Sequence, residues 1–281
     1  PPASAIKPAI AMYGIEEGLI DWNFSIFDEG FFTLPEDGRI YRDWKEGGHG
    51  NTNLFKAITQ SSNTYFFDLA YRSDINQLNK HLLSLGFGDK ACIDCFEEDK
   101  AFVPEPSWKM NKHNFGWFKG DTVNMGVGQG YLVSTPVQLA KYAYIIANKG
   151  KFSDLSLKKD LVKSEKSIEF NKFSNDDWFK LHESMVNVIE GNTGTARRLR
   201  ERKNYIVAAK TGTAELVSGD NREQYSETRL DDSLRDHALI IAFGPMPNPR
   251  YAVSVVVENG ESGGSVAGPV AISVLNSLIQ E

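Results

Sequence analysis

Three short polar motifs occur in a fixed order along this chain of 281 residues. They are S-x-x-K at 4–7, S-x-N at 61–63 and K-T-G-T at 210–213. S-x-x-K alone is weak evidence, because composition produces chance copies such as the one at 156–159. All three motifs in this order, in suitable local contexts, indicate one site. The fold must therefore bring the start of the chain next to the strand near residue 210.

The first motif provides a serine with a candidate base. An unassisted serine hydroxyl is a poor nucleophile. Lys7 lies three positions after Ser4, so both side chains fall on one face of a helix. Lys7 can act as a base only when neutral, and losing its proton at pH 7 costs about 4–5 kcal/mol. Burial and the positive charge of Lys210 can supply this free energy. We therefore predict Ser4 as the nucleophile and Lys7 as the base.

The second motif is suited to proton relay and peptide binding. Ser61 can pass a proton between Lys7 and a leaving amine. Asn63 carries both an amide donor and an amide acceptor, which match the two polar groups of a peptide backbone. We therefore assign Ser61 to catalysis and Asn63 to substrate binding.

The third motif is suited to a carboxylate. Lys210 supplies a cation, and Thr211 and Thr213 supply hydroxyls. Gly212 lets a substrate backbone lie close to the strand edge, where a peptide can dock as an added strand. The backbone N–H groups of Ser4 and Thr213 are the candidate oxyanion hole.

Composition and charge exclude several classes of protein. The net charge of −6 argues against a nucleic-acid surface, and the basic run at 197–203 is expected to be a solvated face. No apolar run reaches the ~18 residues of a membrane span, and no signal peptide is evident. The length favours one large domain or two closely packed subdomains.

Cys92 and Cys95 form a C-x-x-C pair. In an oxidising compartment the pair could close a small disulfide, whereas in the cytosol it would suggest redox or metal chemistry. Zinc would need two further ligands. Unpaired structural cysteines are the third alternative, and the sequence leaves all three open.

Apolar periodicity and turn signals predict an α+β arrangement. The predicted helices cover 5–20, 53–71 (with a polar break at S-x-N), 75–86, 136–148, 175–190 and 269–280. The predicted strands cover 206–215, 238–244 and 251–258. The other segments are predicted to be loop at 22–50, mostly loop at 87–135, short strands and loop at 150–172, and a polar excursion at 216–234.

The chain resembles the penicillin-binding proteins over its whole length. P-P-A-S-A-I-K-P at 1–8 is similar to the family's P-P-G-S-x-x-K-P, with Ala3 in place of the usual glycine. G-V-G-Q-G at 126–130, followed by Thr135 and Pro136, is similar to a transpeptidase stretch. Four further segments resemble the elongation-specific class B type, penicillin-binding protein 2: Y-R-D-W at 41–44, G-H-G at 48–50, G-T-A at 194–196 and R-D-H at 235–237.

This resemblance implies a penicillin-binding/serine β-lactamase-like transpeptidase fold, an antiparallel sheet flanked by helices with a helical subdomain. One transpeptidase domain would span 1–281, with two further strands, a pedestal and an inner-membrane anchor expected upstream. The implied activity is peptidoglycan D,D-transpeptidation of stem peptides during elongation, in the periplasm, with acylation by β-lactams. The implied partner is a glycosyltransferase of the shape, elongation, division and sporulation class, and no cofactor is required.

The resemblance also suggests a possible zinc site. Some relatives of this type hold zinc with two aspartates, a histidine and the cysteine at the middle of S-x-N. Here the first three ligands would be Asp28, Asp43 and His49, but the fourth position is Ser62. A neutral hydroxyl is a much poorer zinc ligand than a thiolate. We therefore expect weak zinc binding or none, with a hydrogen-bonded loop clasp as the alternative.

Other functions remain as alternatives: a serine β-lactamase, a D,D-carboxypeptidase, or a non-catalytic β-lactam sensor. A class A β-lactamase needs a deacylating glutamate. Glu97, Glu98 and Glu105 lie between S-x-N and K-T-G, and none stands in an E-x-x-L-N context. The sequence therefore favours a stable acyl-enzyme.

Overall fold

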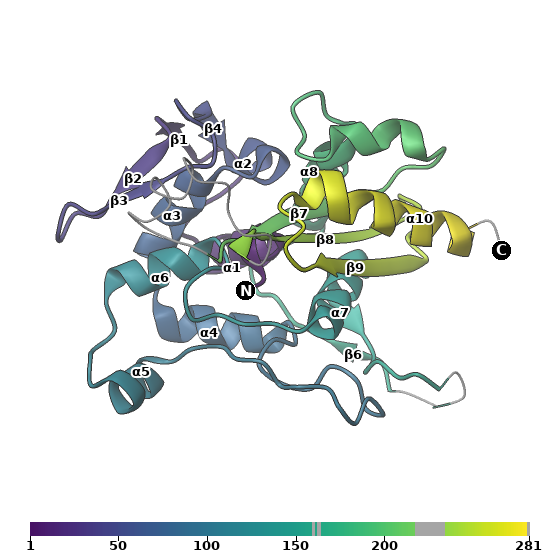
Figure 1. The fold of residues 1–281 in the computed structure, drawn as a ribbon, viewed down its shortest axis with the longest axis horizontal. Coiled ribbons are helices and arrows are strands. Elements are labelled where there is room, and N and C mark those ends of the chain that lie inside the picture. The colour runs from purple at the N-terminus through teal and green to yellow at the C-terminus, as the bar shows by residue number, and fades with distance from the viewer. Residues whose placement is uncertain (159–160, 162–163, 217–233, 280–281) are drawn as a thin grey trace.

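A three-stranded antiparallel sheet runs through the middle of the structure, a computed structural model that describes residues 1–158, 161, 164–216 and 234–279 (Figure 1). Its order is β7 (Ala208–Ala214), β8 (His237–Gly244) and β9 (Tyr251–Val257). Lys210 pairs with Ile241 and Thr213 with Ala238 across β7 and β8. The K-T-G-T motif therefore lies on a strand at one edge of this sheet.

The central strand β8 separates two hydrophobic clusters. Leu239, Ile241 and Phe243 face the larger cluster, which contains the helical core. Ala238 and Ile240 face the smaller one, packed under α10 (Gly268–Ile279). Successive side chains of a strand point to opposite faces of the sheet. Both faces of β8 are covered by other elements, so both carry apolar side chains. Figure 1 shows α10 lying along one face of the sheet.

Helix α1 (Lys7–Glu16) is the centre of the helical subdomain and follows a 3₁₀ turn, η1 (Ala3–Ile6). Every residue of α1 from Lys7 to Ile15 is buried. A helix that is apolar nearly all round is stable only inside a core. The predicted helix at 5–20 is thus confirmed in its central part: its first residues form the 3₁₀ turn, and α1 ends at Glu16, four residues before the predicted end.

The helix predicted over 53–71 is split in two, as its polar break suggested. α2 (Leu54–Gln60) and α3 (Asn63–Arg72) meet at Ser61, which adopts the left-handed conformation with φ 60° and ψ 37°. Ser62 caps α3, since its Oγ accepts from the Tyr65 N–H. A left-handed residue ends a helix and a serine cap starts one.

The other predicted helices are confirmed as α4 (Ile75–Ser84), α7 (Pro136–Ala147), α8 (Asn175–Glu190) and α10. Capping boxes start two of them, Thr135 with Gln138 at α7 and Ser174 with Asp177 at α8. Each box satisfies free N–H groups of the first turn. Because this pattern of side chains is visible in the sequence, the starts of these two helices could be predicted from it.

The loop prediction for 22–50 is wrong. This segment contains three short strands, β1 (Ser25–Asp28), β2 (Phe31–Thr33) and β3 (Ile40–Arg42), and the first residue of a fourth, β4 (Gly50–Asn53). β1 pairs with β4 and β2 with β3, both antiparallel. Strands of three or four residues are too short to show a clear alternation, and the β1–β4 pairing is not local.

The segment 87–135 also has more regular structure than predicted. It contains α5 (Pro106–His113) and α6 (Lys119–Gly126). In α5 only Lys109 is buried, so the helix lacks the apolar face that reveals a helix in sequence. The short strands expected in 150–172 are β5 (Lys151–Phe152) and β6 (Lys166–Ser167). The polar excursion predicted at 216–234 falls almost entirely outside the described residues.

Two remaining elements flank the sheet: a 3₁₀ helix, η2 (Arg197–Arg202), which holds most of the basic run, and a π-helical turn, η4 (Gly263–Ala267). Cys92 and Cys95 are joined by a disulfide, so the unpaired and metal-binding alternatives do not hold in this structure. Among the residues described, no helix has the length and apolarity needed to cross a bilayer.

Candidate active site

The candidate nucleophile Ser4 lies on η1, between strand β7 and the loop that follows α6. The Ala3 N–H donates to the Gly128 carbonyl oxygen at 2.9 Å. On the other side, a methyl group on Gly212 would stand 3.2 Å from the Ala5 nitrogen and 3.3 Å from the Pro2 oxygen. Glycine at position 212 therefore lets β7 run close to the backbone that carries Ser4.

All three motifs meet at the hydroxyl of Ser61. Lys210 Nζ lies 2.8 Å from Ser61 Oγ, and Lys7 Nζ lies 3.3 Å from the same oxygen. Ser61 owes this position to the left-handed break between α2 and α3. The convergence expected from the motif order is thus present, with Ser61 as the bridge between two buried lysines.

Lys7 is completely buried among acceptors. Its Nζ donates to the carbonyl oxygens of Ser61 at 2.8 Å and Ser62 at 3.1 Å, and to Asn63 Oδ1 at 2.6 Å. Burial lowers the pKa of Lys7 to about 7, although the charges of Asp43 and Asp28 act to raise it. A neutral amine at this position is therefore accessible near neutral pH, which a general base requires.

Lys210 is equally buried, and its pKa also lies well below the usual range. Burial is the main cause, and the nearby charge of Lys7 adds to it. Its Nζ donates to Ser61 Oγ and to the Thr211 carbonyl oxygen at 3.0 Å. Two cations this close disfavour each other, so the pair favours a state in which one of them is neutral.

The Lys7 contact fixes how Asn63 faces the site. Because Asn63 Oδ1 accepts from Lys7, its amide nitrogen is the end left to face a ligand. The sequence suggested that Asn63 could both donate to and accept from a peptide. In the structure its acceptor is occupied by Lys7, so only its N–H donor is available to a substrate.

The outer edge of β7 completes the site. In the sheet described above, β7 pairs with β8 on one side only. Gln129 Nε2 donates to the Thr213 carbonyl oxygen at 3.2 Å, and the hydroxyls of Thr195 and Thr211 lie 2.7 Å apart. An extended peptide placed along this edge would meet Thr211 and Thr213 next to Ser4. The proposed oxyanion hole at Ser4 and Thr213 stays a prediction.

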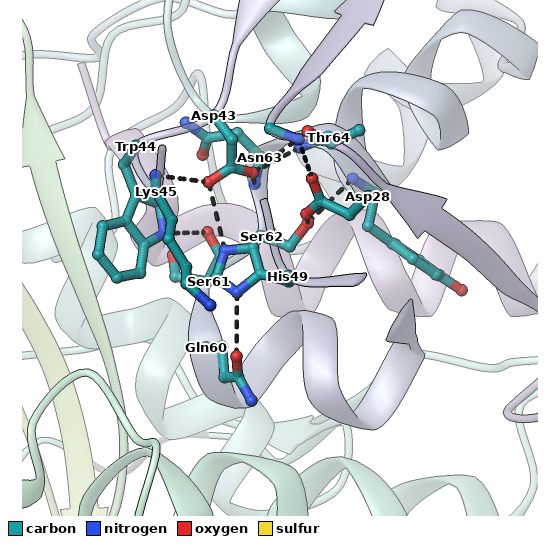
Figure 2. A network of polar contacts seen from close by, with 12 residues as sticks. Asp28, Asp43, Trp44, Lys45, His49, Gln60, Ser61, Ser62, Asn63 and Thr64 are labelled. Atoms are coloured by element: carbon teal, nitrogen blue, oxygen red, sulfur yellow. Dashed lines mark hydrogen bonds and ion pairs between the residues drawn. The ribbon is translucent and has the colours of Figure 1, made fainter. Parts of the chain in front are cut away.

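A second polar network lies directly behind the S-x-N turn (Figure 2). One atom each from Asp28, Asp43 and His49 lies within 4.8 Å of the others, and all three side chains are buried. Asp43 Oδ1 is 3.3 Å from His49 Nε2, and His49 Nδ1 is 2.9 Å from Gln60 Oε1. Ser62 Oγ donates to Asp28 Oδ2 at 2.7 Å.

Asp43 also holds the start of α3. Its Oδ2 accepts from the N–H groups of Asn63 at 2.6 Å and Thr64 at 2.9 Å. Burial acts to raise the pKa of Asp43, but the hydrogen bond from His49 and the charge of Lys7 outweigh it and lower the pKa to about 2. Asp43 is therefore an anion placed at a helix N-terminus, where the helix dipole stabilises it.

Comparison with known proteins agrees with this geometry. Residues 1–276 match the penicillin binding protein transpeptidase domain. The chain belongs to this family. The fold prediction made from the sequence resemblance is thus confirmed.

The chain is similar to family members whose names concern peptidoglycan. It is 37% identical over its whole length to the peptidoglycan D,D-transpeptidase MrdA of Haemophilus influenzae and 39% identical, over 95% of its length, to MrdA of Acinetobacter baumannii. It spans 44% and 40% of those two proteins, less than half of their length.

Solved structures of the family show the same fold. Penicillin-binding protein 2 of Pseudomonas aeruginosa, solved with the compound WCK 5153, superimposes with a TM-score of 0.88 at 34% identity, over all of this chain and 61% of that one. The Helicobacter pylori protein, solved in complex with MreC, gives a TM-score of 0.87 at 31% identity, over 99% of this chain and 50% of that one.

The buried network allows a test of whether zinc fits this family member. The two carboxylates and the His49 ring converge. When only His49 Nδ1 carries a proton, Nε2 could bind a metal in place of its hydrogen bond to Asp43. A zinc ion bound here would use Asp28, at the end of β1, with Asp43 and His49, both in the loop between β3 and β4. Ser62 does not complete the set, because its Oγ donates to Asp28 and accepts from Tyr65.

Several residues at the site received no individual function from sequence reasoning. Trp44, Gln129 and Thr195 lie within the stretches that resemble the family, yet the contacts of their side chains could not be read from those stretches. The sequence suggested Asp43 as a metal ligand or as part of a hydrogen-bonded loop clasp, but not its hydrogen bonds to two backbone N–H groups of α3. The resemblance of these stretches to the family was the only sign in the sequence that these residues lie at the site. Their individual contacts depend on the fold.

Proposed function

We propose that this chain is the transpeptidase domain of a peptidoglycan D,D-transpeptidase. In this proposal Ser4 is acylated by the D-Ala-D-Ala end of a stem peptide and then transfers the acyl group to an amine of a second stem peptide. The observation that carries it is the Ser61 hydroxyl, placed between two buried lysines of low pKa, one of which, Lys7, directly follows the turn that bears Ser4.

In the acylation step, Ser4 Oγ bonds to the carbonyl carbon while its proton passes to neutral Lys7. The bond from that carbon to the terminal D-alanine nitrogen then breaks. The leaving nitrogen takes up a proton through Ser61, which contacts both lysines. An ester on Ser4 remains, and attack by the acceptor amine restores Ser4 and forms the cross-link.

Substrate recognition follows from the same geometry. The amide nitrogen of Asn63 would donate to the peptide backbone, while Lys210, Thr211 and Thr213 would receive a carboxylate. A β-lactam presents a carboxylate and a reactive carbonyl in a similar arrangement. The same groups would therefore bind a β-lactam, and its carbonyl would acylate Ser4.

None of the three glutamates named above is placed as the deacylating base that a class A β-lactamase needs. Glu98 accepts from the backbone N–H groups of Ala91 and Cys92 in the disulfide loop. Glu105 precedes α5, where its carboxylate contacts Ser107. Glu97 is exposed in the same loop as Glu98. These positions support a long-lived acyl-enzyme rather than rapid hydrolysis.

The finer assignments belong to the same proposal. The relatives named MrdA support action in cell elongation, and the MreC complex was described for the Helicobacter pylori protein. We infer a comparable assembly here, with a glycosyltransferase of the shape, elongation, division and sporulation class. We also infer a periplasmic location and an inner-membrane anchor supplied by a segment outside this chain.

The test is mass spectrometry of the protein after addition of penicillin. We expect one long-lived adduct on Ser4, absent from Ser4→Ala. Ser156→Ala is the matched control, because Ser156 begins the chance copy of S-x-x-K and its hydroxyl donates to Asp94. An adduct that persists in Ser4→Ala would disprove the assignment, and an adduct lost within minutes would favour the β-lactamase.

A further inference from the structure

We propose that Trp44 is a positioning residue for the acylation reaction: its indole N–H holds the backbone of Ser61, and thereby keeps the Ser61 hydroxyl within hydrogen-bond distance of both lysines. This inference rests on the proposed function, because it concerns the rate at which Ser4 is acylated. Trp44 lies in the loop between β3 and β4. Figure 2 shows its indole ring beside the S-x-N turn.

The contact is a hydrogen bond onto an oxygen that Lys7 also uses. Trp44 Nε1 donates to the Ser61 carbonyl oxygen at 3.1 Å, and Lys7 Nζ donates to the same oxygen at 2.8 Å. A carbonyl oxygen has two lone pairs, so it can accept both bonds. When Lys7 becomes neutral or turns toward Ser4, the bond from Trp44 keeps this buried oxygen satisfied.

The backbone of Ser61 needs such support. Its φ of 60° is in the left-handed region, which a residue with a side chain occupies only at an energetic cost. The residue next to Trp44 holds the other side of the same turn, because Asp43 accepts from the N–H groups of Asn63 and Thr64. Two consecutive residues of one loop thus bind the carbonyl at the start of the turn and the N–H groups at its end.

The position of the Ser61 hydroxyl depends on that backbone. Its Oγ lies 2.8 Å from Lys210 Nζ, within reach for direct proton transfer, and 3.3 Å from Lys7 Nζ, just beyond that reach. A small rotation of the Ser61 peptide would move this oxygen away from one lysine. Misplacement of about 1 Å is enough to slow an enzymatic step strongly.

Trp44 does not act by filling the core. It is 59% exposed, and its main aromatic contact is the His49 ring, 5.5 Å away between centroids. An exposed ring contributes little apolar burial, so removing the indole N–H should leave folding stability nearly unchanged. A tryptophan whose polar end points inward while its ring stays in water is better explained by the hydrogen bond.

The experiment compares two donor-free variants, Trp44→Phe and Trp44→Leu, with the matched control Trp22→Phe. Trp22 also donates its indole N–H, at 2.8 Å, but to Asp177 on α8. Stopped-flow acylation by a chromogenic cephalosporin gives the first-order acylation constant and the dissociation constant of the preceding complex separately. Thermal unfolding is measured in parallel.

We expect both Trp44 variants to lower the acylation constant about 3–10-fold, the scale of one neutral hydrogen bond, with the dissociation constant within about twofold. Trp22→Phe should keep both constants. An unchanged acylation constant, a change confined to the dissociation constant, a loss in only one Trp44 variant, or an equal loss in Trp22→Phe would each overturn the inference. If the unaltered protein is not acylated at Ser4, the proposed function itself fails, and this inference fails with it.

Discussion

Gly128 lies so close to Ala3 that a methyl group on Gly128 would come within 2.2 Å of the Ala3 carbonyl oxygen. The Ala3 N–H donates to the Gly128 carbonyl oxygen, and both residues have positive φ, 48° at Ala3 and 73° at Gly128. This contact fastens the residue just before Ser4 to the loop after α6. The position of the candidate nucleophile thus depends on a glycine more than 120 residues further along the chain.

We expect Gly128→Ala to lower the free energy of unfolding by about 2–5 kcal/mol, the sum of overpacking and left-handed strain. Penicillin labelling of Ser4 should fall with it. Gly38→Ala is the matched control, because Gly38 has the same φ of 73° and nothing within 4 Å of the added methyl group. It should lose only the strain, about 1–2 kcal/mol. Equal losses in urea unfolding would show that the contact with Ala3 does not matter.

We expect Ala3→Gly to stabilise the protein by up to about 1 kcal/mol, because glycine adopts the φ of 48° without strain. The melting temperature should rise by about 2–4 °C per kcal/mol. Ala9→Gly, in the buried helix α1, should have the opposite sign and cost about 1 kcal/mol. A melting temperature that falls alike in both variants would show that Ala3 is not strained.

Acylation should rise with pH around the pKa of Lys7, about 7, because only the neutral amine can accept the Ser4 proton. The pKa is lowered from 10.5, so the unfolded chain binds more protons between pH 7 and 10.5. The Lys7 contribution to stability is therefore unfavourable below pH 7 and improves across that window. Lys7→Arg should lower acylation at least about 10²-fold. A flat pH profile with an active arginine variant would make Lys7 structural only.

Zinc should bind weakly or not at all to the unaltered protein, because Ser62 is hydrogen-bonded to Asp28 and Tyr65. Ser62→Cys supplies a thiolate to join Asp28, Asp43 and His49, so zinc should raise its melting temperature and a chelator should reverse the rise. Ser62→Ala is the control and should show no zinc-dependent rise. Stoichiometric zinc in the unaltered protein, by elemental analysis, would contradict this prediction.

Thr213→Val should weaken recognition of a carboxylate while keeping the backbone N–H and the β-branched shape. We expect acylation by a β-lactam to fall by about 10–150-fold, equal to about 1.5–3 kcal/mol for a hydrogen bond to a charged group. The loss should shrink for an analogue whose carboxylate is esterified. Equal losses for acid and ester would show that Thr213 does not contact the carboxylate.

The sequence alone determined the family, the α+β class and the residues of the three motifs. It also predicted most helices, because α7 and α8 begin with capping boxes and α1 is apolar nearly all round. These signals are local, set by the spacing of apolar residues and by the side chains at helix ends. Such features can be read before any tertiary contact is known.

The tertiary structure alone decided what depends on contacts between distant segments. It paired β1 with β4, oriented the Asn63 amide through Lys7, and placed Trp44 on the Ser61 carbonyl. It also lowered the pKa of Lys7 by burial, which converts an ordinary lysine into a candidate base. Desolvation and hydrogen-bond geometry arise only when separate segments pack together, so no local pattern of residues encodes them.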